Sequence, residues 1–382
     1  MSNRIARIRT SAVAAATLVL VAGAESAQTA DPPTRPHRTG APSAARVGET
    51  HRTGERAAAA VRDAEGRTTL RITIWYPAAE GSVAKPLLIG PPDAPLFEAG
   101  WAAPDAPFRA DAPGTRRPVI LLSHGFGGTA RGVAWFGTAM AADGYVVIAV
   151  DHPGNNAMDP MTAAGAILSW ERAEDLKHAL DVVSRDPLLG GHIDLDRVGV
   201  AGFSAGGFTA LVLGGARVEP DRLMRFCQAN PDDGVCRPQV EAVVTEADRD
   251  SALARPDVAA LVARAGNDHS LASVRAVFAM APAIVQAIPP ASLEAMDVPV
   301  WIVTGDADDV APPATNARVA AAHIPGARLT LLPGAGHYVF LATCTGAGVA
   351  AIPVCRLAGA QEDAHRTATA QGKELFGRYL TD

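Results

Sequence analysis

The sequence predicts an α/β fold built on a mostly parallel, doubly wound sheet, and three observations support this prediction. Continuous apolar runs that read as buried strands alternate with helical segments between residues 118 and 332, as a parallel sheet covered on both faces requires. The apolar run at 197–201 leads through Gly-Phe-Ser-Ala-Gly into a helical segment. The chain has 382 residues, 48% of them hydrophobic, which is enough for a large core.

The N-terminus has the pattern of a secretory signal peptide. Three arginines precede an apolar run at 12–24, which is shorter than the ~20 residues that span a bilayer. Small residues ending at Ala24 suit cleavage, and Ala27 or Ala30 would also serve. Residues 1–24 are therefore predicted to be a signal peptide and not a stable membrane anchor; an anchor helix is the alternative.

The next segments lack the regular alternation of the core. Residues 25–56 are rich in Pro, Thr, Arg and Ala, and are predicted to be a flexible leader to a folded domain at 57–382. Residues 68–76 alternate apolar and polar side chains, which predicts an antiparallel strand with one open face. Residues 85–117 are dense in Pro, Ala and Asp, and predict a long ordered loop or a partial lid.

Strands and helices then alternate along the chain, apart from one interruption. Residues 215–270 are polar and Asp-rich, so they predict an insertion, which is either a cap over the site or a plain surface excursion. Strands are predicted at 118–122, 145–150, 197–201, 274–281, 298–304 and 328–332, and helices at 133–143 and 169–184.

The four cysteines suit an exported protein. Cys227 and Cys236 are nine residues apart, and Cys344 and Cys355 are eleven apart. Three pairings are possible, and the two local ones are predicted. Neither spacing is typical of a zinc site.

The charge of the chain limits its partners. Charged residues make up 19% of the sequence, the formal net charge is −6, and no basic run is present. This composition argues against nucleic acid or an anionic membrane as a partner. Neither a cofactor nor a metal is predicted.

The motif Gly202-Phe203-Ser204-Ala205-Gly206 matches the G-x-S-x-G pattern of a nucleophile elbow. A strand-to-helix turn this tight forces strained backbone angles, and small flanking residues relieve the crowding. Ser204 is therefore the predicted nucleophile. A serine hydroxyl needs a general base, which in turn needs an orienting acid.

On such a scaffold the acid and then the base follow the serine along the chain. The strand at 298–304 leads into a glycine turn and Asp308, which is the predicted acid. Asp306 and Asp309 remain alternatives, or they form the turn and cap a helix that starts at Pro313.

His337 is the predicted base because it follows the last strand on a glycine-rich loop. The other histidines have structural interpretations. His323 is predicted to be a surface or capping residue and His269 to be solvated, while His178 and His365 fall in helical patterns.

An oxyanion hole needs two convergent backbone N–H groups. Ala205, at the start of the helix after Ser204, supplies one. Phe126, in the glycine-rich loop 123–128, is the candidate for the other. His124 is expected to brace this loop by hydrogen bonding rather than to act as a base.

Six motifs are spread along the chain: Ser-His-Gly-Phe-Gly-Gly (123–128), Val-Asp-His-Pro-Gly-Asn (150–155), Gly-Phe-Ser-Ala-Gly-Gly (202–207), Gly-His (336–337), Trp-Tyr-Pro (75–77) and Trp-Glu-Arg (170–172). Together they resemble a known family of exported bacterial hydrolases, described as dienelactone-hydrolase-like and related to plasma-type platelet-activating-factor acetylhydrolases. The resemblance covers residues 57–380 and implies an α/β-hydrolase fold that acts on esters without a cofactor. True dienelactone hydrolases use Cys where this chain has Ser204, and plasma-type acetylhydrolases take the acid after an earlier strand, where no carboxylate precedes Glu294.

The sequence thus predicts a secreted or periplasmic serine esterase that works through an acyl-enzyme, on a small-molecule or polymeric ester. An amidase or peptidase with the same triad is the alternative, followed by a non-catalytic binding module. A dehalogenase or epoxide hydrolase is excluded because both need Asp at the elbow. The candidates for an apolar acyl site are Leu96, Phe97, Trp101 and Phe108.

Overall fold

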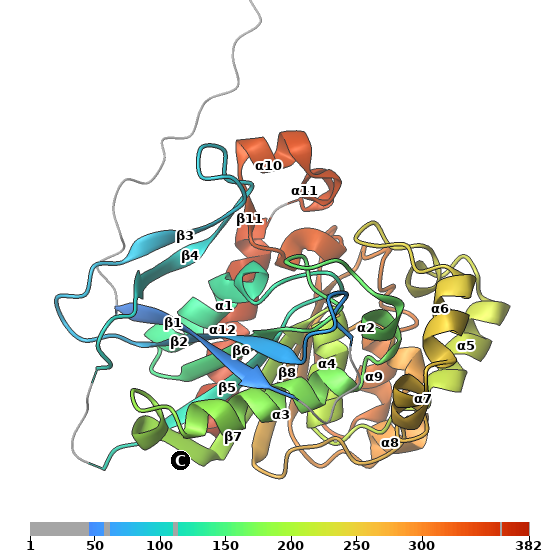
Figure 1. Ribbon diagram of the computed structural model, residues 1–382, viewed down its shortest axis with the longest axis horizontal. Coiled ribbons are helices and arrows are strands. Elements are labelled where there is room, and N and C mark those ends of the chain that lie inside the picture. The colour runs from blue at the N-terminus through green and yellow to red at the C-terminus, as the bar shows by residue number, and fades with distance from the viewer. Residues whose placement is uncertain (1–45, 57–61, 110–113, 360, 382) are drawn as a thin grey trace, which may run out of the picture. The chain divides into compact units, whose positions relative to one another are not determined.

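Eleven strands form one sheet in the part of the chain that the computed structural model describes, residues 46–56, 62–109, 114–359 and 361–381 (Figure 1). The predicted signal peptide and residues 25–45 of the predicted leader lie outside the described residues. The strands are β1 (Val47–Glu55), β2 (Thr69–Pro77), β3 (Lys85–Ile89), β4 (Phe97–Pro104), β5 (Arg117–Ser123), β6 (Val146–Asp151), β7 (Ile193–Phe203), β8 (Val274–Met280), β9 (Val300–Gly305), β10 (Arg328–Leu332) and β11 (Thr343–Cys344).

The central part of the sheet is parallel. Its order is β10-β9-β8-β7-β5-β6-β2-β1-β4-β11, with β3 paired to β4. The first six strands of this order run parallel, whereas β2 is antiparallel to both β6 and β1. Parallel neighbours joined through helices make a doubly wound sheet, so the predicted fold class is confirmed.

The helices connect these strands. They are α1 (Ala134–Ala142), α2 (Ala163–Ile167), α3 (Glu171–Ser184), α4 (Ala205–Leu213), α5 (Pro220–Ala229), α6 (Glu246–Leu253), α7 (Pro256–Val262), α8 (Pro290–Glu294), α9 (Ala317–His323), α10 (Gly346–Ala351), α11 (Pro353–Leu357) and α12 (Gln361–Tyr379). Short 3-10 turns are η1 (Arg131–Val133), η2 (Gly190–His192), η3 (Gly234–Cys236), η4 (Val285–Ala287) and η5 (His337–Phe340).

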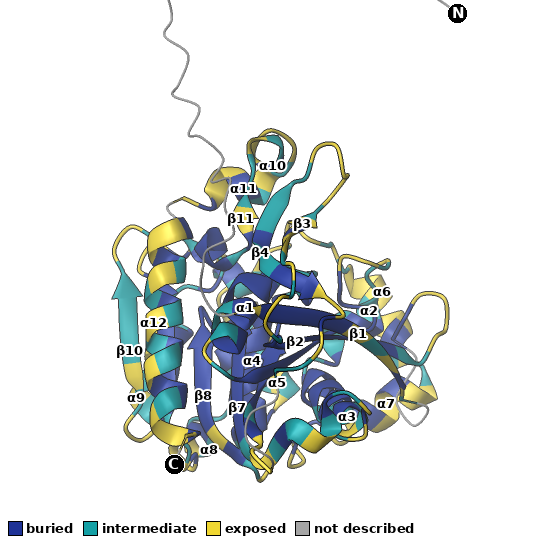
Figure 2. Cartoon of the chain, turned by 90° about the vertical axis from the view of Figure 1, so that its left-hand side faces the viewer, coloured by how far each residue is buried: buried dark blue, intermediate teal, exposed yellow. Residues whose placement is uncertain are grey.

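Two apolar cores lie on opposite faces of the sheet. Successive residues of one strand alternate between them: on β6, Ile148 belongs to one core, and Val147 and Ala149 to the other. Leu176 of α3 and Phe208 of α4 pack into the first core. Helices α1 and α12 cover the second, and Figure 2 shows α12 with its buried side toward β8. Burial on both faces explains why these strands read as continuous apolar runs.

Three predictions near the N-terminus are wrong. The predicted leader 25–56 contains β1, which pairs with β2 over its full length, so the folded domain starts before residue 57. The predicted loop 85–117 contains strands β3 and β4. Strand β2 has no open face from Ile72 onward, because Ile72 packs into one core and Trp75 into the other.

The predicted insertion 215–270 is confirmed as an excursion between α4 and β8. It holds α5, η3, α6 and α7, which lie together on the right of Figure 1. Both predicted disulfides are present, Cys227–Cys236 within the excursion and Cys344–Cys355 near the C-terminus. Each cross-link closes a short loop and stabilises the fold by about 2–3 kcal/mol in the chain-entropy estimate.

Candidate active site

Ser204 lies at the sharp turn between β7 and α4, with φ 57° and ψ −118°. A non-glycine residue rarely adopts a positive φ, so the surrounding structure must hold this strain. The flanking glycines make the turn possible. A Cβ on Gly202 would lie 2.1 Å from the carbonyl oxygen of Gly206, and a Cβ on Gly206 would lie 2.0 Å from that of Ser123. Larger residues at these two positions would clash with the backbone, so the turn requires glycine at both. The elbow thus has the form that the motif predicted.

His337 meets Ser204 from the loop after β10. Its Nε2 lies 2.9 Å from Ser204 Oγ, and its Nδ1 lies 2.7 Å from Asp308 Oδ2. A carboxylate only accepts hydrogen bonds, so Nδ1–H donates to Asp308 and Nε2 accepts the serine hydroxyl. All three side chains are buried. The structure thus brings together the three residues proposed from the sequence.

Asp308 is held on both carboxylate oxygens. Oδ1 accepts hydrogen bonds from the backbone N–H groups of Val310, 3.0 Å away, and Ala311, 2.8 Å away. This leaves Oδ2 fixed for the imidazole. The two alternative acids lie elsewhere: Asp306 accepts from the N–H of Gly334, and Asp309 is 81% exposed at the surface. The helix predicted to start at Pro313 begins only at Ala317, after a turn.

The two candidate oxyanion donors lie beside the nucleophile. Ala205 is the first residue of α4, immediately after Ser204. The loop that carries Phe126 contacts the elbow, since a Cβ on Gly125 would lie 3.3 Å from Ser204 Cβ. Within the described chain, the backbone N–H groups of Phe126 and Ala205 donate no hydrogen bond. Two unpaired donors next to a serine hydroxyl suit the binding of a developing oxyanion.

A cavity of about 260 Å³ opens beside Ser204 and His337. Of the four residues proposed for an acyl site, Phe97 lines it, whereas Phe108 stacks on Tyr76 and His192 elsewhere. The walls are otherwise built from segments far apart in the chain. Their apolar members are Ile89, Phe97, Phe126, Val133, Ala157, Phe203, Leu341, Ala342, Ile352 and Val354.

The cap over this cavity consists of β3, β4, β11, α10 and α11, which gather at the top of Figure 1. The Cys344–Cys355 disulfide closes the C-terminal part of the cap. Ile352 and Val354, which lie within this disulfide loop, line the cavity. The cysteine spacing predicted the cross-link, but no local pattern showed that this loop would meet strands β3 and β4.

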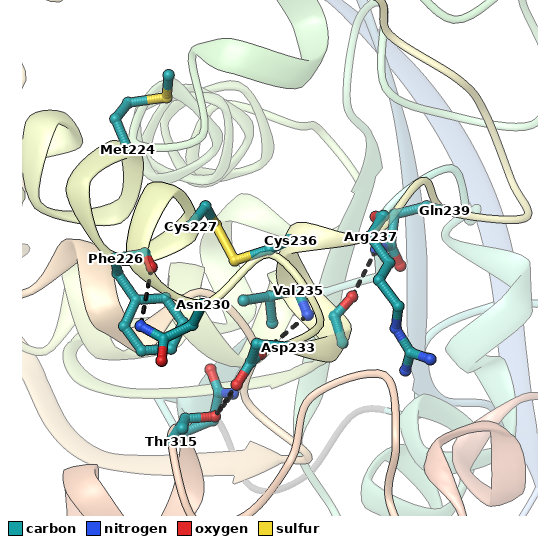
Figure 3. Close-up of a disulfide and its surroundings, with 12 residues drawn as sticks. Met224, Phe226, Cys227, Asn230, Asp233, Val235, Cys236, Arg237, Gln239 and Thr315 are labelled. Atoms are coloured by element: carbon teal, nitrogen blue, oxygen red, sulfur yellow. Dashed lines mark hydrogen bonds between the residues drawn. A yellow bond between two sulfur atoms is a disulfide. The ribbon is translucent and has the colours of Figure 1, made fainter.

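The excursion 215–270 packs against the loop that carries Asp308, and it also reaches the cavity. Glu241 is its one residue among the described lining of the cavity. Next to the Cys227–Cys236 disulfide, Asp233 points toward Thr315 and accepts its hydroxyl at 2.8 Å (Figure 3). A Cβ on Gly234 would lie 2.1 Å from the carbonyl oxygen of Asp309, so this turn packs tightly against the Asp308 loop.

The remaining histidines have structural roles. The prediction for His269 is wrong: it is 6% exposed, and its Nδ1 lies 2.9 Å from a carboxylate oxygen of Glu174. His323 ends α9 and pairs with Glu294, as expected of a capping residue. His365 of α12 stacks on a tryptophan ring. His124 braces its loop as expected, with Nδ1 2.6 Å from the carbonyl oxygen of Gly125.

Known proteins resemble this chain in sequence and in fold. The model of the alpha/beta hydrolase family matches residues 119–351. A cutinase, Est2 of Thermobifida alba, is 35% identical over 101 residues, which span 26% of this chain and 30% of the cutinase. A ferulic acid esterase from Streptomyces cinnamoneus has a similar fold, with a TM-score of 0.57, 20% identity, and coverage of 90% of this chain and 92% of that one.

Proposed function

Because the chain belongs to the alpha/beta hydrolase family, we propose that it is an exported serine hydrolase that cleaves carboxylic esters. The observation that carries this proposal is the hydrogen-bonded series Ser204–His337–Asp308 at the wall of an apolar cavity. The similar proteins named above are esterases by their names, which supports the choice of ester over amide. The narrower dienelactone-hydrolase-like subtype stays a prediction.

In the proposed reaction, Ser204 Oγ attacks the ester carbonyl while His337 Nε2 takes its proton. Asp308 keeps the imidazole in the required tautomer and stabilises its cation. The N–H groups of Phe126 and Ala205 bind the oxyanion of the tetrahedral intermediate. His337 then protonates the departing alcohol, which leaves an acyl-enzyme. Water attacks this acyl group by the same steps, releasing the acid and restoring the serine.

The cavity limits the acyl group. Its volume of about 260 Å³ is just below the range of ~300–1,000 Å³ typical of ligand pockets. Short to medium aliphatic acyl groups or a single-ring aromatic acyl group fit this space.

A p-nitrophenyl ester series from acetate to dodecanoate tests the proposal. The wild type is expected to hydrolyse the series with a maximum of kcat/KM at or below the octanoate. Ile352→Ala should move this maximum toward longer chains by enlarging the cavity. Val349→Ala is the matched control, because Val349 is 44% exposed on the same cap and does not line the cavity. A folded wild type that hydrolyses no member would overturn the esterase proposal.

The same triad could cleave amides, so an ester and its isosteric amide should be compared directly. Preference for the amide would favour the amidase or peptidase alternative. Inactivity on both would favour the binding module.

Export is part of the proposal. Residues 1–24 carry the signal-peptide pattern, and both disulfides suit an oxidising compartment. None of the helices within the described ranges is long and apolar enough to cross a bilayer. N-terminal sequencing of the exported protein should find a start after Ala24, Ala27 or Ala30; an uncleaved Met1 terminus would contradict the signal peptide.

A further inference from the structure

A second series of serine, histidine and aspartate lies beneath the proposed active site. The Oγ of Ser123 is 2.9 Å from His152 Nε2, and His152 Nδ1 is 2.8 Å from Asp175 Oδ2. The residue types and distances resemble those of the Ser204 site. However, all three residues have essentially no exposed surface, so no substrate can reach this serine. The series needs a role other than nucleophilic attack.

The protonation of this buried series is determined by its neighbours. Burial lowers the pKa of His152 to about 3, so the imidazole is neutral at neutral pH. The guanidinium groups of Arg62 and Arg56 hold the pKa of Asp175 well below its usual range, against the opposing effect of burial. The ionised carboxylate can only accept, so Nδ1–H of His152 donates to it. His152 Nε2 therefore accepts the hydroxyl proton of Ser123.

His124 links the Ser123–His152–Asp175 series to the loop 123–128, which carries the proposed oxyanion donor Phe126. The backbone N–H of His152 donates to His124 Nε2 at 3.2 Å. His124 is also buried, and burial lowers its pKa well below the usual value. Its single proton is therefore on Nδ1, which donates to the carbonyl oxygen of Gly125 at 2.6 Å. That oxygen also accepts the N–H of Gly128 at 3.1 Å.

The oxygen of Gly125 and the N–H of Phe126 belong to the same peptide group. Two hydrogen bonds to the oxygen fix the plane of this peptide and so the direction of its N–H. They also polarise the amide, and hydrogen bonds in series strengthen one another in a low-dielectric interior. The N–H of Phe126 is the donor proposed for the oxyanion.

Arg172 holds the other side of the loop. Its Nη2 donates to the carbonyl oxygen of His124 and, at 3.3 Å, to Ser123 Oγ. Its Nε donates to Thr209 on α4 at 3.1 Å, which ties the loop to the elbow helix. Burial lowers the pKa of Arg172 to about 9, so it remains a cation at neutral pH.

We propose that His124 and His152, anchored by Asp175 and Arg172, are positioning residues that hold and polarise the Gly125–Phe126 peptide for oxyanion binding. This inference rests on the proposed esterase function. In this inference the two buried histidines help to stabilise the transition state, although neither touches the reacting atoms. Their effect should therefore appear in kcat and in sensitivity to the carbonyl atom of the substrate, and not in substrate binding.

The test compares His124→Leu with His124→Asn. An asparagine amide can place a donor where Nδ1 stands, whereas leucine has none. His124→Leu is expected to lower kcat for a soluble ester about 10- to 100-fold with KM changed less than threefold, since an oxyanion donor contributes about 10²–10³ in kcat. His124→Asn should recover most of this loss.

A thiono ester gives the second readout, because sulfur is a weak hydrogen-bond acceptor. The wild type should prefer the oxygen ester over the matching thiono ester, and His124→Leu should lose the part of that preference that the N–H of Phe126 contributes, while the N–H of Ala205 keeps the rest. Ser123→Ala weakens the same series from its other end and should lower kcat by a smaller factor. His323→Leu, at the C-terminal end of α9 and outside this network, is the control and should leave kcat unchanged.

The outcomes separate the two claims. If the folded wild type hydrolyses esters, and folded His124→Leu keeps its kcat or its oxygen preference, the positioning role is overturned and the esterase stands. If His124→Leu fails to fold, Ser123→Ala decides through the same ratio: an unchanged oxygen preference in this variant overturns the inference. A wild type inactive on every ester overturns the proposed function itself, and the inference falls with it.

Discussion

Replacing Ser204 by alanine is expected to lower kcat for p-nitrophenyl ester hydrolysis by about 10⁴- to 10⁶-fold. The hydroxyl 2.9 Å from His337 Nε2 is the only part of the side chain removed. Alanine fits the turn as well as serine does, so the thermal unfolding midpoint should hardly change. The remaining rate would come from the oxyanion donors and from binding alone. Steady-state kinetics on the purified mature protein measure the loss.

Substitutions of catalytic residues that act together do not lower kcat additively, and this gives the experiment a second readout. Asp308→Asn should also lower kcat by about 10⁴-fold, because an asparagine amide favours the wrong tautomer of His337. The double variant with Ser204→Ala should be no slower than Ser204→Ala alone. Ser251→Ala, on the exposed side of α6, is the matched control. A phosphonate probe should label wild type and control but not Ser204→Ala; labelling of that variant would place the nucleophile elsewhere.

The strands of the parallel core were predictable because each is buried on both faces. The sequence of such a strand is a continuous apolar run, whichever strands pair with it, as at residues 118–122 and 145–150. Strand β1 is different. Its sequence is polar, and it is held by its backbone pairing with β2 and by Glu49, which accepts the indole N–H of Trp75 and pairs with Arg131. These contacts join residues 26 and 82 positions apart, so no local pattern signals them.

The triad was predictable for a related reason. In a parallel sheet, loops after the carboxyl ends of neighbouring strands meet at one edge, so chain order alone suggested Ser204, Asp308 and His337. The walls of the cavity follow no such rule. Ile89 and Ile352 line the same cavity only because the β3–β4 hairpin pairs with β11, at the start of the disulfide-closed loop of the cap. The buried role of His152 was equally hidden, since its motif was visible but its partner Asp175 lies on another helix.

Acidification is expected to destabilise the folded protein strongly between pH 7 and pH 5. Burial lowers the pKa of His124 well below its usual value, that of His152 to about 3 and that of His365 to about 4. In the unfolded chain each histidine titrates near ~6.5. Above that pH neither state binds these protons, so the stability is fully present. As the pH falls below it, the unfolded state takes up about three protons that the folded state refuses, and stability is lost.

The size of this effect follows from the proton difference. For these three histidines alone, the proton difference corresponds to a slope of about 4 kcal/mol per pH unit near pH 5, and to roughly 5 kcal/mol lost between pH 7 and pH 5. His178, whose pKa burial also lowers, adds to this loss. That is comparable with the whole stability of a typical domain. Urea unfolding at pH 7, 6 and 5 measures it. His365→Phe, which keeps a ring against Trp135, should reduce the slope by about a third, whereas the control His323→Asn, at the half-buried end of α9, should not. A free energy of unfolding that stays flat from pH 7 to 5 would contradict the neutral buried histidines, and with them the tautomers on which the oxyanion loop depends.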